Sequence, residues 1–219
     1  MSNRNRNNNN NNKDLSRLSK FLALVLRHNG VDMGLKFRPD GYTELSSLMK
    51  LDGMKQHSTA NIYAVVDTNE KKRYTILTDN KGKVWIRANQ GHSGKVSDAI
   101  DQNQLLEEIT SHEQIPICVH GTNRKAYEFI KDQGLSKRER HGIHFASGTS
   151  EDSSVISGMR TNSKVLVYIN VEKAMNDGIK FFVSTNGVIL SPGDSTLQDS
   201  DGYSGVLKPE YFSKVEFVK

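Results

Sequence analysis

The sequence predicts an α+β fold, and three observations indicate it. First, hydrophobic residues early in the chain recur every three or four positions, which is typical of one face of an amphipathic helix: Leu15, Leu18, Leu22 and Val25. Second, the stretch RYTILTDNKGKVWIRA consists of two strand-like segments around a turn at residues 79–82. Third, short apolar runs with strand character dominate after Pro116. Helices and strands are therefore expected in separate parts of the chain.

The bulk composition indicates a globular protein with an anionic partner. The chain has 219 residues, 35% of them hydrophobic, and one cysteine, Cys118, which excludes an internal disulfide. It has neither a long apolar run nor an apolar leader, so we expect an intracellular protein, cytoplasmic or nuclear, without a membrane span. The net charge of +5 fits nucleic acid, although many soluble proteins are mildly basic.

The first 95 residues are predicted to form a tail and a lobe. Residues 1–13 are asparagine-rich and almost without apolar side chains, which predicts a disordered tail. Asp14 is a candidate N-cap for the first helix. Short helices are expected at residues 44–51 and after Ser58. Three helices before a β-hairpin form a winged-helix-like order, so residues 14–95 are predicted to be a lobe of a shape often used on nucleic acid, a use the fold alone does not establish.

The rest of the chain is predicted to be a linker and a second lobe. Residues 96–113 are polar and read as the linker. Residues 114–219 read as a strand-rich α+β lobe. A helix at 124–133 should end at Gly134. Strands are expected in the segments PICVHG, GIHFAS, KVLVYIN, KFFVS and GVILS, with a short helix at VEKAMNDG.

Four polar groupings could carry chemistry. They are Arg27-His28, IRANQGHSG (residues 86–94), VHGTNR (119–124) and RERHGIHFAS (138–147). Each also has a structural interpretation: Arg87 can be a surface residue at a strand end, His120 a buried core histidine and Thr122 a helix cap.

The Arg27-His28 pair shows how the structural and the functional interpretations differ. At a helix C-terminus, where the dipole is negative, two basic side chains followed by Asn29-Gly30 fit an ordinary C-cap. Alternatively the pair binds a phosphate, since arginine presents forked donors that match phosphate oxygens. Because the dipole opposes an anion there, further cations must converge on it. Arg87 and Arg140 are the best candidates.

Other chemistries lack their motifs. The seven histidines and one cysteine form neither a C-x-x-C nor an H-E-x-x-H pattern, so no metal is expected. GxGxxG, the Walker phosphate loop and a nucleophile elbow are also missing from the sequence. What remains is a set of arginines and histidines without an obvious carboxylate pair.

The groupings resemble the NAD-dependent tRNA 2′-phosphotransferase family. The matching pieces run from about residue 15 to the C-terminus: LSKFLALVLRH, DGY, KKRY, IRANQGHS, HGT, RERHGIHFAS and KAMNDGIKFFVSTNGVIL. IRANQGHS is highly specific, whereas LRH or HGT alone would be weak. The resemblance implies a winged-helix lobe that grips the RNA 2′-phosphate and a second lobe, similar to ADP-ribosyltransferase toxins, that holds NAD.

The resemblance also implies the site residues. The family's catalytic set falls on Arg27, His28, Arg87 and Arg140. Gly142 replaces the first histidine of the family's Arg-x-His-hydrophobic-His pattern, so Arg140 is assigned by its offset from His144, with Arg138 as the alternative. The implied NAD-binding residues are His120, Gly121, Thr122, His144, Ser147, Gly158 and Arg160. The implied RNA-binding residues are Gln90, His92 and Ser93.

The implied reaction has two steps and no metal. The 2′-phosphate of splice-junction tRNA attacks C1″ of the NAD ribose and nicotinamide leaves; the ribose 2″-hydroxyl then attacks the attached phosphate. The products are 2′-OH RNA and ADP-ribose 1″,2″-cyclic phosphate. The enzyme is expected to act as a monomer, with His28 assisting proton transfer.

Two other functions stay open on the sequence. The second lobe could leave a stable ADP-ribose on a nucleic-acid end or a protein, although no E-x-E motif supports protein modification. A non-enzymatic RNA binder is the other alternative, and it leaves the second lobe unexplained.

Overall fold

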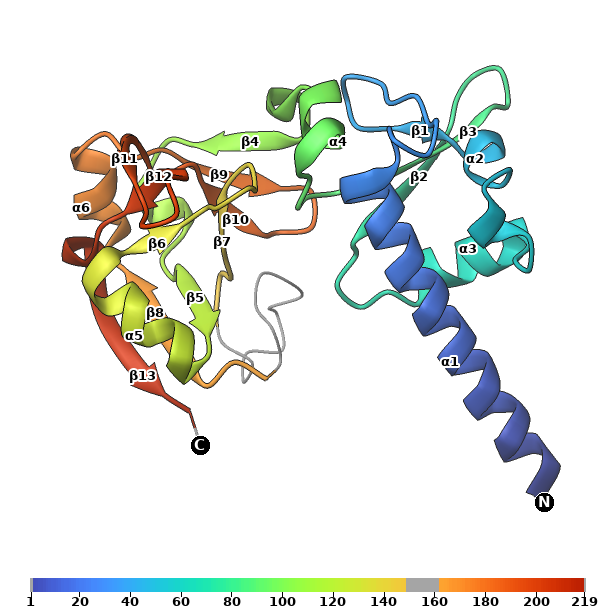
Figure 1. Cartoon of the computed structure of the whole chain (residues 1–219), viewed down its shortest axis with the longest axis horizontal. Helices are drawn as coiled ribbons and strands as arrows, with labels where there is room; N and C mark the ends of the chain where they lie inside the picture. Colours follow the sequence, from blue (N-terminus) through green and yellow to red (C-terminus); the bar gives the residue numbers. More distant parts are fainter. Residues whose placement is uncertain (1, 149–161, 219) are drawn as a thin grey trace. The chain divides into compact units, whose positions relative to one another are not determined.

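The chain folds into two compact α+β units, Met1–Gln102 and Asn103–Lys219. The computed structural model describes residues 2–148 and 162–218 (Figure 1). Each unit has its own hydrophobic core. The mixture of helices and strands confirms the predicted fold class. Within the described ranges, no helix is both long and apolar enough to cross a bilayer.

The first unit combines helices with a small antiparallel sheet of order β1-β3-β2. Its helices are α1 (Ser2–Leu24), the π-helical turn η1 (Val25–Asn29), α2 (Leu45–Leu48), η2 (Asp52–Met54), α3 (Thr59–Asp67) and α4 (Gly94–Ala99). Its strands are β1 (Thr43–Glu44), β2 (Tyr74–Thr78) and β3 (Val84–Ala88). The hairpin and the helix after Ser58 are confirmed, and Ser58 forms a capping box with Asn61.

The core of this unit follows the predicted helical spacing. Leu18, Leu22 and Val25 are at most 1% exposed and pack in one cluster with Ile62 of α3 and Ile86 of β3. Burying one such side chain contributes about 1.5–3 kcal/mol. The core thereby fixes the end of α1, and with it Arg27 and His28.

Both ends of the first helix differ from prediction. α1 begins at Ser2, so the N-cap at Asp14 is wrong, while the disorder of the tail at 1–13 stays a prediction. Once packing anchors residues 15–25, extending the helix backwards needs no new nucleation. Gly30 is the C-cap residue, as predicted, but it lacks the left-handed conformation of an ordinary glycine cap: its φ is −59°, and its N–H donates to Val25 O at 2.9 Å, closing a π-turn.

Close packing explains the glycine at this position. A Cβ added to Gly30 would lie 2.6 Å from the Val25 carbonyl oxygen and 2.7 Å from the Phe37 ring. π-Turns are rare and frequent at functional sites, and this one presents Arg27 and His28.

Over residues 103–148 and 162–218, the second unit contains three small antiparallel sheets and two α-helices. The sheets have the orders β4-β9-β10-β7, β13-β8-β5 and β11-β12-β6. The strands are β4 (Leu106–Ile109), β5 (Val119–Thr122), β6 (Leu135–Ser136), β7 (Ile143–Phe145), β8 (Val165–Ile169), β9 (Phe181–Ser184), β10 (Ile189–Ser191), β11 (Asp194–Gln198), β12 (Ser204–Leu207) and β13 (Phe212–Phe217). The helices are α5 (Arg124–Gln133) and α6 (Val171–Asn176), with 3₁₀ turns η3 (Gln102–Gln104), η4 (His112–Gln114) and η5 (Pro209–Tyr211).

One core serves all three sheets. Phe145 and Phe181 come from the first sheet, Val167 from the second, and Leu135 and Leu207 from the third. The expected strands are confirmed as β5, β7, β8, β9 and β10, and both expected helices are confirmed as α5 and α6. The predicted linker at 96–113 is wrong, because Leu106–Ile109 pairs with β9. Two exposed glutamates there precede the buried Ile109, as an edge strand allows.

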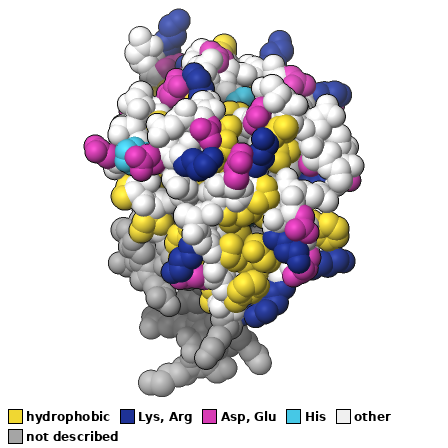
Figure 2. Space-filling view, turned by 90° about the vertical axis from the view of Figure 1, so that its left-hand side faces the viewer, with side chains coloured by type: hydrophobic (Ala, Val, Ile, Leu, Met, Phe, Trp, Pro, Cys, Tyr) yellow, Lys and Arg dark blue, Asp and Glu magenta, His cyan; other side chains and the backbone are white. Residues whose placement is uncertain are grey.

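Charge is mixed on one surface of the molecule. Figure 2 shows Lys and Arg side chains interspersed with Asp and Glu around a band of hydrophobic side chains. The net charge of +5 therefore does not gather into one basic field on the face shown there.

Candidate functional site

The Arg27-His28 pair is held by the loop that follows β3. Arg27 Nη2 donates to Gln90 Oε1 at 2.9 Å, and His28 Nδ1 shares a hydrogen bond with Ser93 Oγ at 2.8 Å. The Ser93 backbone N–H donates to the Arg27 carbonyl at 2.9 Å. Two groupings more than 60 residues apart along the chain thus meet. The convergence of Arg87 and Arg140 on the same phosphate, which the phosphate-binding interpretation requires, stays a prediction.

The loop is shaped by its own buried residues. Asn89 is 3% exposed; its side chain accepts from Thr75 Oγ1 and donates to the Lys72 carbonyl, both at 2.7 Å. Gly91 has a φ of +83°, and a Cβ there would lie 3.5 Å from the Arg27 guanidinium. His92 is 1% exposed, so its side chain packs inside the unit, and its assignment to RNA stays a prediction.

Ser93 gives its hydroxyl to His28 rather than to the helix it precedes. It is the N-cap residue of α4, with extended backbone, yet its side chain makes no cap hydrogen bond. An N-cap side chain ordinarily contributes about 1 kcal/mol to helix stability. Ser93 therefore lacks the usual N-cap hydrogen bond, and its hydroxyl instead orients the His28 ring.

Arg87 is oriented by the turn before β1. Its Nη1 donates to the Asp40 carbonyl at 3.0 Å, and its guanidinium lies 4.8 Å from the centre of the Tyr42 ring. Asp40 and Tyr42 both belong to the DGY motif, and Asp40 also lies in the Pro39-Asp40-Gly41 turn. Tyr42 and Asp40 were not predicted as site residues, although the DGY motif was a usable signal.

In the second unit, His120 and His144 lie together. His120 Nδ1 donates to the His144 carbonyl at 2.9 Å, and His144 Nδ1 donates to the Gly142 carbonyl at 2.9 Å. Because a carbonyl only accepts, each Nδ1 carries a proton, and a ring in its neutral form then has Nε2 as its acceptor. Both rings thus have a fixed tautomer.

A pocket opens beside β5 and α5. It has a volume of about 420 Å³ and is lined by His120 and Thr122 together with residues of α5 and of the loop after β6. Sites for small molecules span roughly 300–1,000 Å³. Thr122 is not the helix cap, since Asn123 Oδ1 accepts from Ala126 N at 2.9 Å. The side chain of Thr122 therefore lines the pocket without a capping role.

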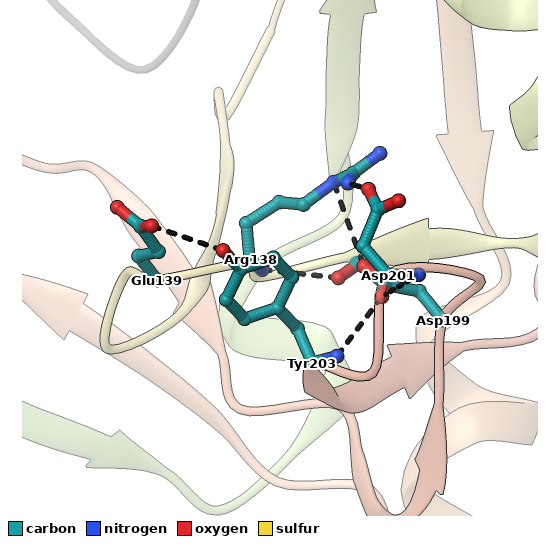
Figure 3. Close-up of polar contacts among 6 residues, drawn as sticks. Arg138, Glu139, Asp199, Asp201 and Tyr203 are labelled. Carbon is teal, nitrogen blue, oxygen red and sulfur yellow. Dashed lines mark hydrogen bonds and ion pairs between the residues drawn. The ribbon is translucent and has the colours of Figure 1, made fainter.

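Arg138 and Arg140 both lie in the loop after β6. Arg138 has a left-handed φ of 56°, pairs with Asp201 and lies 3.5 Å from Asp199 Oδ2 through its Nε. Figure 3 shows its guanidinium directed at these two carboxylates. Two carboxylates neutralise the Arg138 cation, and both Arg138 and Arg140 are exposed. The assignment of Arg140 rather than Arg138 as the anion-binding arginine of this loop stays a prediction.

Hydrogen bonds organise the turn that receives Arg138. Asp199 Oδ1 accepts from the backbone N–H groups of Asp201 and Tyr203, both at 3.0 Å, and the Tyr203 hydroxyl donates to Glu139 at 2.9 Å (Figure 3). Burial acts to raise the pKa of Asp199, but hydrogen bonds from Ser136, Tyr203 and Asp201 and the Arg138 charge hold it below its usual value.

Packing explains the departure at Gly142. A Cβ there would lie 3.1 Å from the Ser191 carbonyl oxygen and 3.4 Å from Leu190 Cβ, on the neighbouring strand β10. A histidine at this position would require that strand to move by a few tenths of an ångström. Glycine therefore suits the close β7-β10 pairing of this chain.

Several predicted site residues complete the account. Gly121 lies in β5, and Ser147 is exposed beyond β7. Gly158 and Arg160 lie outside the described residues. In residues 2–148 and 162–218, no three His, Cys, Asp or Glu side chains form a group suited to a metal. The lone Cys118 is buried, which raises the pKa of its thiol and makes it unsuited to nucleophilic chemistry.

Comparison with known proteins identifies the family. The model of the RNA 2'-phosphotransferase, Tpt1 / KptA family matches residues 13–193. The chain belongs to this RNA 2′-phosphotransferase family. The resemblance read from IRANQGHS and its companion motifs is thereby confirmed.

Named relatives of the RNA 2′-phosphotransferase family extend over most of the chain. The tRNA 2'-phosphotransferase 1 of Danio rerio is 41% identical over 206 residues, covering 93% of this chain and 86% of its own. That of Homo sapiens is 39% identical, covering 90% and 74%. A putative tRNA 2'-phosphotransferase of Schizosaccharomyces pombe is 39% identical over 93% of this chain, which spans about half (52%) of that relative.

Proposed function

We propose that this chain transfers the 2′-phosphate of RNA to NAD, giving 2′-OH RNA, ADP-ribose 1″,2″-cyclic phosphate and nicotinamide. The observation that carries the proposal is the pairing of Arg27 with Gln90 and of His28 with Ser93 in a member of the RNA 2′-phosphotransferase family. We take splice-junction tRNA as the RNA, because relatives are named tRNA 2'-phosphotransferase.

The first unit is proposed to bind the RNA. Its helices and its β1-β3-β2 sheet support a winged-helix-like lobe. Arg27 and Arg87 each present a guanidinium fixed by a neutral partner, an amide oxygen for one and a backbone carbonyl for the other. Neutral partners orient a guanidinium without cancelling its charge, so both cations keep their attraction for a phosphate.

The second unit is proposed to bind NAD, which is a substrate of this reaction and not a resident cofactor. The pocket beside β5 supports this assignment through its volume and through His120 and Thr122. The fixed Nδ1 proton of His120 directs its Nε2 acceptor away from the His144 carbonyl. Gly121, His144 and Ser147 complete the proposed NAD-binding set within the described residues, and an ADP-ribosyltransferase-like lobe is the fold that this set implies.

The first step makes one bond and breaks one. An oxygen of the RNA 2′-phosphate bonds to C1″ of the NAD ribose while the bond from C1″ to the nicotinamide nitrogen breaks. The nitrogen keeps the electron pair, so nicotinamide leaves neutral and no acid is required. The product is RNA carrying 2′-phospho-ADP-ribose. The nucleophile belongs to the RNA, which is why the chain needs no activated serine or cysteine.

The second step places charge on phosphorus. The ribose 2″-hydroxyl loses its proton and attacks the phosphate, and the bond from phosphorus to the RNA 2′-oxygen breaks as that oxygen takes up a proton. The proposed roles are charge stabilisation by Arg27, Arg87 and Arg140 and proton transfer by His28. Ser93 holds the His28 ring in one orientation for that transfer.

Product analysis tests the proposal. A 2′-phosphorylated oligoribonucleotide is incubated with the chain, with and without NAD, and the products are separated by chromatography. We expect 2′-OH RNA, the cyclic phosphate and nicotinamide in equal amounts, only when NAD is present. Absence of NAD-dependent dephosphorylation would refute the proposal, and a stable ADP-ribose on an RNA end or on protein would support the alternative transferase.

A further inference from the structure

A basic turn links α3 to β2 in the first unit. We define it as Lys71, Lys72 and Arg73. The strand register pairs Tyr74 with Ala88, so Arg73 lies next to Asn89. Asn89 N donates to the Arg73 carbonyl at 2.9 Å, and Asn89 Nδ2 donates to the Lys72 carbonyl at 2.7 Å. The turn is thus joined by its backbone to the loop that holds Arg27.

Hydrogen bonds order the backbone of the basic turn. Asn69 Oδ1 accepts from Arg73 N at 3.1 Å and from Arg73 Nη1 at 3.4 Å, and the Lys72 N–H donates to the Asn69 carbonyl at 2.8 Å. Lys72 adopts a left-handed φ of 41°, which costs a residue with a side chain about 1 kcal/mol or more. The fold tolerates this cost, and the hydrogen bonds fix the backbone that carries the three cations.

The three side chains of the basic turn bring positive charges close together. Burial, and then the neighbouring Arg73 charge, lower the pKa of Lys71. An anion that binds beside them relieves this repulsion. Among charged residues, Lys20 and Glu70 line the adjoining groove with Arg73, so two cations face one carboxylate there.

The residue that follows the turn contacts α1, the helix that leads to Arg27. Tyr74 is 3% exposed, and its hydroxyl donates to the Ser19 carbonyl of α1 at 2.6 Å. A groove of about 640 Å³ runs beside it, between α1 and the α3-β2 connection. Hydroxyl and amide groups line the groove together with these charges: Ser16, Ser19, Thr68 and Asn69.

We propose that the basic turn binds the phosphodiester backbone of the RNA strand that continues from the 2′-phosphorylated nucleotide. The adjoining groove then accommodates a flanking nucleotide. The inference rests on the proposed function, because it takes Arg27 as the binding point of the 2′-phosphate. Arg27 fixes the reacting phosphate, and the turn extends recognition along the chain. RNA length should therefore increase affinity without changing the chemical step.

The test uses the full chain and direct binding without NAD, so that no turnover occurs. The probes are a 2′-phosphorylated dinucleotide and a longer single strand containing the same 2′-phosphorylated step. The variant is Lys71→Gln with Lys72→Gln, and Lys72→Gln alone guards against a folding defect. The matched control removes two cations elsewhere in the same unit, with Lys55→Gln and Lys81→Gln, both of them exposed.

The expected result is selective for the longer RNA. Each neutralised phosphate of a single strand contributes about −0.7 to the slope of log K against log salt, so losing two contacts reduces the slope by about 1.4. At about 0.1 M salt this is a loss of affinity of roughly 10-fold or more. The control variant and the dinucleotide should show no such loss, and kcat with NAD should be unchanged while KM for the longer RNA rises.

Other outcomes overturn the inference. An equal loss in the control variant would assign the effect to net charge alone. An equal loss for the dinucleotide would place the turn at the reacting phosphate itself, and no loss at all would remove its role. Competition by an acidic peptide as strong as that by RNA of equal charge would also contradict a phosphodiester site. If wild-type protein fails to dephosphorylate RNA with NAD, the proposed function fails while the salt slope still tests the turn.

Discussion

Replacing Arg27 by alanine separates a phosphate-binding role from a structural one. In the folded protein Arg27 Nη2 donates one hydrogen bond to Gln90, and its backbone carbonyl accepts from Ser93. The substitution removes the first contact and keeps the second. A hydrogen bond from a charged group contributes about 1.5–3 kcal/mol, and domains have about 5–15 kcal/mol of stability. Arg27→Ala should therefore remain folded.

The effect on catalysis should be larger than the effect on folding. Removing a donor that contacts developing charge costs on the order of 10²–10³ in rate. The second step carries the charge on phosphorus, so Arg27→Ala should accumulate RNA bearing 2′-phospho-ADP-ribose. The assay is a time course with radiolabelled 2′-phosphorylated RNA and NAD, resolved by electrophoresis, beside a thermal unfolding curve of the same sample.

Arg17→Ala is the matched control. Arg17 lies on the same helix, its side chain is 80% exposed, and its ion pair with Asp14 is on the surface. This variant should keep both stability and rate. If Arg27→Ala reduces the rate no more than Arg17→Ala does, or if its folded fraction has normal chemistry, the phosphate-binding assignment of Arg27 is wrong.

Three further predictions concern Ser93, Asp199 and Cys118. Ser93→Ala should lower the rate of the second step and alter its pH profile through His28 while costing about 1 kcal/mol of stability, and Ser93→Thr should restore both; equal defects in the two variants would contradict an orienting role. Because the fold lowers the pKa of Asp199, its stabilisation is present above the unfolded pKa and is lost as pH falls through the folded one, so Asp199→Asn should flatten the acid limb of a stability curve; an unchanged acid limb would oppose this. Cys118, at 2% exposure, should react with iodoacetamide only at the rate of unfolding, which mass spectrometry can follow under increasing urea; rapid labelling of the native chain would disprove its burial.

The regular elements could be predicted where local chemistry decides them. The helical spacing in α1, the helix that starts after Ser58 and the turn at residues 79–82 each leave a local signal in the sequence. The short strands β1, β6 and β11 could not be predicted in this way. They are two to five residues long and polar or mixed, and pairing makes them regular: β1 pairs with the distant β3, β6 with the distant β12, and β11 with its neighbour β12.

The sequence by itself determined the family, the fold class and the residue types of the site. The order of the motifs carries that information, because arginines and histidines at characteristic positions indicate which chemistry the site can perform. The tertiary structure decided which groups meet. Gln90 reaches Arg27 and Ser93 reaches His28 across more than 60 residues, and Arg138 is paired with Asp201. These contacts follow from how buried strands and helices pack, and packing over long separations leaves no periodic signal in the sequence.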